Sequence, residues 1–173
     1  PRALVLSVCQ NMEGVEAVNF NSPSQIVISG KKEAVKKASH HLKEKGARRV
    51  IPLSVSGAFH TPLMRKAALE FSQGLDKIHF SPPTFPIISN VFAKPASTAK
   101  EVKQALKLQM DHPVLWEDSM RKLISSGIEL FIEVGPGKVL QGLLRSIYRK
   151  ANILGAERPE DIEKIISYIV SRM

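Results

Sequence analysis

The chain has 173 residues, a length typical of one domain or of a domain with a small appendage. Hydrophobic residues make up 43% and charged residues 24%, which is the balance of a globular protein rather than a disordered one. The single cysteine, Cys9, excludes a disulfide framework and a cysteine-based zinc site, so we expect a cytoplasmic protein. No apolar run reaches the roughly 18 residues of a membrane span, and no membrane partner is expected.

The net charge of +9 predicts a surface that attracts polyanions. Most lysines alternate with glutamates in KKEAVKK, HLKEK and EVKQALK, a pattern typical of solvated helix faces. An acidic protein partner or a phosphorylated carrier is the alternative explanation. Aromatic residues make up only 6%, too few for a base-stacking platform, so nucleic acid is not an expected partner.

The first 55 residues are predicted to be rich in strands. Apolar and β-branched runs indicate strands over residues 3–8, 16–21, 25–29 and 48–55. Between them, KKEAVKKASHHLKEKG has apolar residues at helical spacing and ends at Gly46, which predicts a helix over residues 31–46.

The remaining residues are predicted to be mainly helical. Thr61 is a good N-cap and Pro62 suits a first helical position, and Thr98 with Glu101 forms a capping-box pattern. We expect helices over residues 61–75, 98–112, 116–127, 138–148 and 160–170, with strands over 84–91 and 128–134. Alternating strands and helices predict an α/β fold, divided into subdomains of residues 1–55 and 56–173.

His60 is the first candidate for chemistry. It lies between a predicted strand and the helix that follows Pro62, and the positive end of a helix dipole disfavours imidazolium. A neutral imidazole can accept a proton, as a general base must. The alternative is a histidine that only satisfies a helix end or a loop.

Gln109 is the second candidate. It falls on the apolar stripe of its predicted helix, where a polar side chain needs a hydrogen-bond partner. It either caps a neighbouring loop or orients a catalytic group, and its main-chain carbonyl near the helix end is free to accept a bond.

Two motifs that would suggest other chemistry are absent. The stretch EVGPGKVLQGL lacks the spacing of a phosphate-binding loop and is better explained as a tight strand-to-helix turn. No G-x-S-x-G nucleophile elbow occurs, and no histidine pair has metal-ligand spacing, so neither a serine nucleophile nor a metal is predicted in this chain.

Four segments together resemble malonyl-CoA:acyl carrier protein transacylases, in order and approximate spacing. They are VNFNSPSQIVISG (18–30), GAFHTPLM (57–64), LQMDHPVLW (108–116) and FIEVGPGKVLQGLL (131–144). The resemblance is to the C-terminal part of that family. It implies an incomplete ferredoxin-like small subdomain followed by the C-terminal part of an α/β-hydrolase-like subdomain. Only CQNMEGV separates the first two predicted strands, where the family has a helix, so we expect that helix to be missing.

The resemblance also implies a mechanism. A serine takes a malonyl group from malonyl-CoA and passes it to the phosphopantetheine thiol of acyl carrier protein, in fatty acid biosynthesis. His60 corresponds to the general base, and Gln109 orients it through its backbone carbonyl. Phe59 is expected to exclude branched acyl groups, and Asn19, Asn21 and Asn90 match polar pocket positions. Coenzyme A and phosphopantetheine thioesters are substrates, and no cofactor is expected.

The serine, the oxyanion segment and the arginine that binds the malonyl carboxylate are expected in a segment outside this chain, which begins with Pro1 rather than Met. We therefore expect this chain alone to be inactive. A non-catalytic module that binds the carrier protein is the alternative function.

Overall fold

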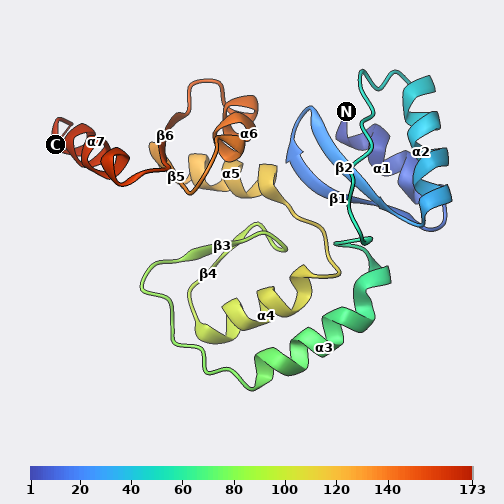
Figure 1. The fold of residues 1–173 in the computed structure, drawn as a ribbon, viewed down its shortest axis with the longest axis horizontal. Coiled ribbons are helices and arrows are strands. Elements are labelled where there is room, and N and C mark those ends of the chain that lie inside the picture. Colours follow the sequence, from blue (N-terminus) through green and yellow to red (C-terminus); the bar gives the residue numbers. More distant parts are fainter. Residues whose placement is uncertain (173) are drawn as a thin grey trace. The chain divides into compact units, whose positions relative to one another are not determined.

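The computed structural model describes residues 1–172 and has the expected α/β fold (Figure 1). It divides into two compact units, residues 1–119 and 120–173, and helix α5 (Trp116–Ser125) crosses the division. The expected subdomain boundary after residue 55 stays a prediction. None of the helices within residues 1–172 is long and apolar enough to cross a membrane.

The first unit begins with two helices packed on a β-hairpin. Its elements are α1 (Arg2–Gln10), β1 (Val15–Ser22), β2 (Gln25–Gly30) and α2 (Lys32–Glu44). β1 and β2 are antiparallel, and both helices contact them (Figure 1). The apolar faces of these elements form one buried core, which contains Val8, Cys9, Val15, Ala17, Phe20, Ala38 and Leu42.

The prediction of a strand over residues 3–8 was wrong, because this segment is most of helix α1. A short, continuous apolar run fits a buried strand and a buried helix equally well, and periodicity alone does not separate them. The helix that we expected to be missing between the first two strands is therefore α1 itself. The predicted strands over residues 16–21 and 25–29 correspond to β1 and β2.

Gly30 ends β2 at a point where no side chain fits. A Cβ added there would lie 2.0 Å from the main-chain oxygen of Gly14, far inside van der Waals contact. The amide of Lys31 also donates to that oxygen over 2.7 Å. Glycine at this position lets the chain pass from β2 into α2 close beside the start of β1.

The rest of the first unit consists of short elements around two packed helices. These are the 3₁₀ turn η1 (Pro62–Met64), α3 (Arg65–Asp76), β3 (Ile87–Ser89), β4 (Lys94–Ala96) and α4 (Ala99–Gln109). α3 packs against α4, and β3 and β4 form an antiparallel hairpin. The predicted capping box at the start of α4 is confirmed: the Glu101 amide donates to the Thr98 hydroxyl, and the Thr98 amide donates to the Glu101 carboxylate.

The prediction of a strand over residues 48–55 was also wrong. This segment has no regular secondary structure, and its apolar side chains lie in solvent, with Leu53 and Val55 58% and 64% exposed. A strand needs a neighbour to pair its amides and carbonyls, and no strand among the described residues pairs with this one. Pro52 also removes one amide donor.

The second unit contains a β-α-β motif. Strands β5 (Leu130–Val134) and β6 (Asn152–Ala156) are parallel, helix α6 (Val139–Ile147) connects them, and helix α7 (Pro159–Val170) follows (Figure 1). Both α6 and α7 contact β6. The predicted tight turn from strand to helix lies between β5 and α6, and β6 was not predicted from the sequence.

A buried glutamate closes the turn between β5 and α6. The Glu133 carboxylate accepts the amides of Leu140 and Gln141 over 2.9 and 3.1 Å. Burial by itself raises the pKa of the Glu133 carboxyl, but these donated hydrogen bonds outweigh it and hold the pKa below its ordinary value of 4.5. The first amides of α6 are thus satisfied by a carboxylate of the chain itself.

We expect Cys9 to react slowly with alkylating reagents in the folded chain. Burial, and to a smaller extent the charge of Glu16, raises the pKa of the Cys9 thiol from 9.0 to about 11. Because the thiolate is the nucleophile, its alkylation by iodoacetamide at about pH 8 should be roughly 100-fold slower than in the urea-unfolded chain. Mass spectrometry of timed samples measures both rates. Equal rates would contradict the position of Cys9 in the buried face of α1.

We expect Glu133→Gln to destabilise the chain in a pH-dependent way. The folded-state pKa of Glu133 is lowered, so its stabilising contribution is present above the ordinary value of 4.5 and is lost as the pH falls through the folded-state pKa. Urea unfolding should therefore show a larger stability difference between the variant and the parent chain at about pH 7 than at about pH 3. The matched control is Glu129→Gln, at an exposed position. A difference that does not change with pH would contradict this assignment.

Candidate active site

The imidazole of His60 is fixed by a main-chain carbonyl at the end of α4. Its Nδ1 lies 2.8 Å from the Gln109 carbonyl oxygen. A carbonyl only accepts hydrogen bonds, so Nδ1 carries the hydrogen and donates it. In the neutral ring the lone pair is then on Nε2, the nitrogen through which a general base would accept a proton.

The backbone of His60 is held by the carbonyl of Met110, the residue that follows Gln109. His60 has a φ of +64°, in the left-handed region that costs a non-glycine residue about 1 to 2 kcal/mol. Its amide donates to the Met110 carbonyl oxygen over 3.1 Å. Two consecutive carbonyls therefore hold one residue, the first through the ring and the second through the main chain. Strain of this kind persists where the surrounding contacts determine the conformation, often at functional sites.

The segment that follows α4 also joins β1. The Phe20 amide donates to the Val114 carbonyl, and the Val114 amide donates to the Val18 carbonyl, over 2.9 and 2.7 Å. These bonds form a parallel bridge between Val114 and Asn19. One residue further on, the Leu115 amide donates to the Asn90 carbonyl over 2.8 Å.

Four of the six predicted site residues therefore lie at or beside the stretch from Gln109 to Leu115. His60 is bonded to Gln109 itself, while Asn19 and Asn90 lie beside Val114 and Leu115. Asn21 lies two residues beyond Asn19 on β1, half-buried.

The side chain of Gln109 bonds to the turn that follows its own helix. Its Nε2 is 3.3 Å from the His112 carbonyl and 3.4 Å from the Pro113 carbonyl. Both alternatives raised by the sequence thus have a structural counterpart, because the side chain caps a loop while the backbone carbonyl contacts His60. The role of Gln109 in catalysis stays a prediction.

Phe59 directly precedes His60 in the chain, and its side chain is 46% exposed. A Cβ added to Gly57 would come within 3.3 Å of the Phe59 ring, so the ring lies over that glycine. The role of Phe59 in specificity stays a prediction.

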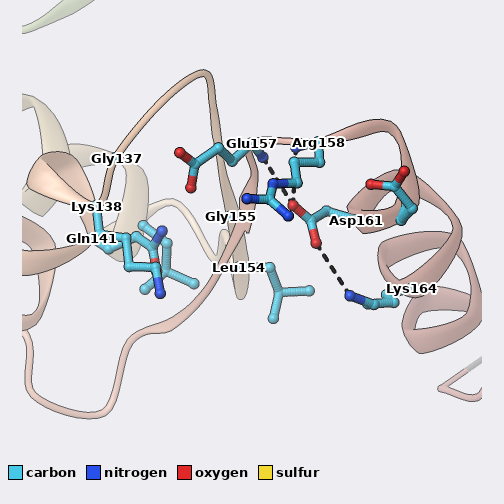
Figure 2. A pocket seen from close by; sticks show the side chains of 11 residues that line it. Gly137, Lys138, Gln141, Leu154, Gly155, Glu157, Arg158, Asp161 and Lys164 are labelled. Carbon is cyan, nitrogen blue, oxygen red and sulfur yellow. Dashed lines mark hydrogen bonds and ion pairs between the residues drawn. The ribbon is translucent and has the colours of Figure 1, made fainter.

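A separate cavity of about 600 Å³ in the second unit contains none of the predicted site residues. Part of its polar lining belongs to the cap of α7. The Asp161 carboxylate accepts the amides of Glu157 and Arg158 and pairs with Lys164 (Figure 2). The amide of Arg158 is the main reason that the pKa of the Asp161 carboxyl lies below its usual value. The Asp161 carboxylate in this cavity thus serves to cap α7.

A comparison with protein families finds a match over residues 5–165 to the acyl transferase domain. The chain belongs to the acyl transferase family. The match covers both compact units, so the resemblance seen in the four sequence segments is confirmed.

Relatives within the acyl transferase family include malonyl-CoA:acyl carrier protein transacylases. The chain is 43% identical over 152 residues to the transacylase of Bacillus subtilis, covering 88% of this chain and 48% of that relative. In the crystal structure of the Xanthomonas oryzae enzyme, 96% of this chain matches 54% of the solved chain at 37% identity, with a TM-score of 0.90. The chain thus spans about half the length of these relatives.

Another solved acyl transferase was captured with a carrier protein. It is described as a type II polyketide-synthase acyl carrier protein in complex with its malonyl-transacylase, and it matches 96% of this chain at 34% identity and a TM-score of 0.88. The match covers 53% of that solved chain.

The sequence alone did not identify Met110 as part of the candidate site. Met110 acts through its main-chain oxygen, and such a contact has no side-chain signal. The left-handed backbone of His60 was equally hidden, because histidine does not mark that conformation in the way glycine does.

Proposed function

We propose that this chain is the part of a malonyl-CoA:acyl carrier protein transacylase that carries the general base. The observation that carries the proposal is the 2.8 Å hydrogen bond between Nδ1 of His60 and the Gln109 carbonyl. It leaves Nε2 to accept a proton, and the family relationship supplies the reaction in which such a base is needed.

The proposed reaction has two transfers. A serine hydroxyl supplied by another segment attacks the thioester carbon of malonyl-CoA while Nε2 of His60 takes its proton. An oxygen–carbon bond forms, the carbon–sulfur bond breaks, and the leaving thiolate takes the proton back from the imidazolium. The thiol of phosphopantetheine then gives its proton to Nε2 and attacks the acyl-serine, and the serine oxygen recovers that proton.

Gln109 would stabilise the charged ring during each transfer. A carbonyl dipole directed at Nδ1–H favours the imidazolium that forms when Nε2 takes a proton. It does so without a carboxylate, which is the usual third member of such a triad. The carbonyl also prevents the ring from rotating, so Nε2 keeps one direction throughout the reaction.

An exposed apolar groove supports the need for a second segment. In the second unit, a groove of about 360 Å³ lies between the β5–β6 sheet and α7 and is lined mainly by aliphatic side chains. Val134 and Ile162 in this groove are 81% and 54% exposed. Apolar surface of this kind usually faces another protein segment. The chain also covers only 48% of its Bacillus subtilis relative.

An acyl carrier protein is the proposed partner. The net charge of +9 suits an acidic, phosphopantetheine-bearing protein, and the structure of a related malonyl-transacylase has been solved in complex with a carrier protein. Malonyl-CoA is the proposed acyl donor, by analogy with the names of the relatives.

The first test is to restore the missing half. The half of the Bacillus subtilis relative that this chain does not cover would be co-expressed with it, and the complex would be isolated by size exclusion. With radiolabelled malonyl-CoA we expect a covalent label on the complex and none on the 173-residue chain alone. His60→Ala should lower the acylation rate by about 10² to 10⁴, the usual share of a general base.

The matched control is His79→Ala, at an exposed histidine outside the site. An isolated complex whose labelling rate is unchanged by His60→Ala would overturn the role of His60. Labelling of the isolated chain would overturn the need for a second segment. Carrier-protein binding by the complex without any transfer would favour the non-catalytic module instead.

We expect Phe59→Ala to relax acyl selectivity in the complex. Removing the ring beside the base makes room for one methyl branch, which is worth roughly 10- to 200-fold in discrimination. The measurement is the ratio of kcat/KM for malonyl-CoA to that for methylmalonyl-CoA. Phe85→Ala, at a phenylalanine that is 78% exposed, is the control. Unchanged selectivity would contradict the steric explanation.

A further inference from the structure

A buried hydroxyl lies immediately after His60. Thr61 is only 1% exposed, and its Oγ1 donates to the Ala58 carbonyl over 2.7 Å. The same oxygen accepts the Leu63 amide over 3.3 Å. A hydroxyl has one hydrogen to donate and two lone pairs, so Thr61 uses both capacities within six residues of chain around the base.

The bond that the Thr61 hydroxyl accepts from the Leu63 amide is an ordinary N-cap of the 3₁₀ turn. The bond that it donates to the Ala58 carbonyl is not part of an N-cap. An N-cap needs only to accept an amide of the following helix. The bond to Ala58 runs in the opposite direction along the chain, spans His60, and is the shorter of the two. It ties together the residues on either side of the left-handed backbone, whose φ is +64°.

Three hydrogen bonds thus act on His60 or on the turn that contains it. Two of them are to the main-chain oxygens of Gln109 and Met110, which no substitution removes. The third is the Thr61 hydroxyl, which is a side-chain group. The contribution of Thr61 can therefore be tested alone.

We propose that Thr61 is a positioning residue for the imidazole of His60. Its hydroxyl closes the turn from Ala58 to Thr61 and so keeps the His60 backbone in the left-handed region. Only in that conformation do the ring and the amide reach consecutive carbonyls at the end of α4. The importance of this positioning for catalysis rests on the proposed function, but the positioning itself does not.

The test uses imidazole NMR of the 173-residue chain labelled with ¹⁵N-histidine, with the His60 signals assigned by their loss in His60→Ala. Long-range ¹H–¹⁵N spectra distinguish a hydrogen on Nδ1 from one on Nε2. In the parent chain and in Thr61→Ser we expect the neutral ring of His60 to carry its hydrogen on Nδ1. In Thr61→Val, which keeps the shape but loses the hydroxyl, we expect a mixture of tautomers.

Hydrogen exchange gives a second measurement. The protection of the His60 amide should fall about tenfold in Thr61→Val, as for the loss of about one hydrogen bond, and should be retained in Thr61→Ser. Thr84→Val makes the same chemical change at an exposed threonine and should alter neither measurement. An unchanged tautomer and unchanged His60 protection in a folded Thr61→Val chain would overturn the proposal.

If Thr61→Val does not fold, hydrogen exchange of the parent chain tests the proposal instead. The Leu63 amide bonds directly to the Thr61 hydroxyl, so its opening reports when that hydroxyl is released. Equal opening free energies and equal urea dependence for the His60 and Leu63 amides support the proposal, and opening of the His60 amide without that of Leu63 overturns it.

The proposed function and the positioning role of Thr61 can be contradicted independently. The NMR and exchange measurements need neither a serine nor malonyl-CoA, so an inactive complex leaves the positioning by Thr61 in place. In an active complex, Thr61→Val should lower kcat about tenfold with the KM for malonyl-CoA unchanged, and Thr61→Ser should restore it. A change in KM alone would overturn the positioning role in catalysis.

Discussion

The hydrogen bond between the His60 ring and the Gln109 carbonyl joins parts of the chain that are 49 residues apart in sequence. On one side is a turn with a strained backbone, and on the other is the last residue of a capped helix. Neither side determines the geometry alone. The turn places the ring, and the helix places an oxygen that is not used within the helix. The direction of Nε2, and with it the proposed chemistry, depends on both.

The sequence predicted best those elements whose ends are marked by side chains. Thr98 and Glu101 fixed the start of α4, and Gly46 marked the end of α2 within two residues. The segment over residues 3–8 was misassigned because a short apolar run carries no period. The strand β6 was missed because NILGA is short and contains a glycine. In the structure that glycine, Gly155, lets the Gln141 side chain approach β6 closely.

The site was predictable to the extent that side chains make it. The types and order of His60 and Gln109 suggested a base and its support, and the structure brings the two together. The contact from Met110 and the left-handed turn were not predictable, since main-chain geometry leaves little trace in residue types. The segment over residues 48–55 shows the opposite case. Its composition favours a strand, but among the described residues it has no pairing neighbour.

The end of α4 has a consequence for how this region can vary. Successive carbonyls of a helix point about 100° apart when viewed down its axis. Because the start of α4 is fixed by Thr98 and its packing against α3 fixes its rotation, the number of residues up to Gln109 decides which oxygen faces the imidazole. One residue inserted within α4 would turn that oxygen away, whereas one inserted in the connection between α3 and β3 would leave it in place. The length of α4 is therefore more constrained than the identities of its surface residues.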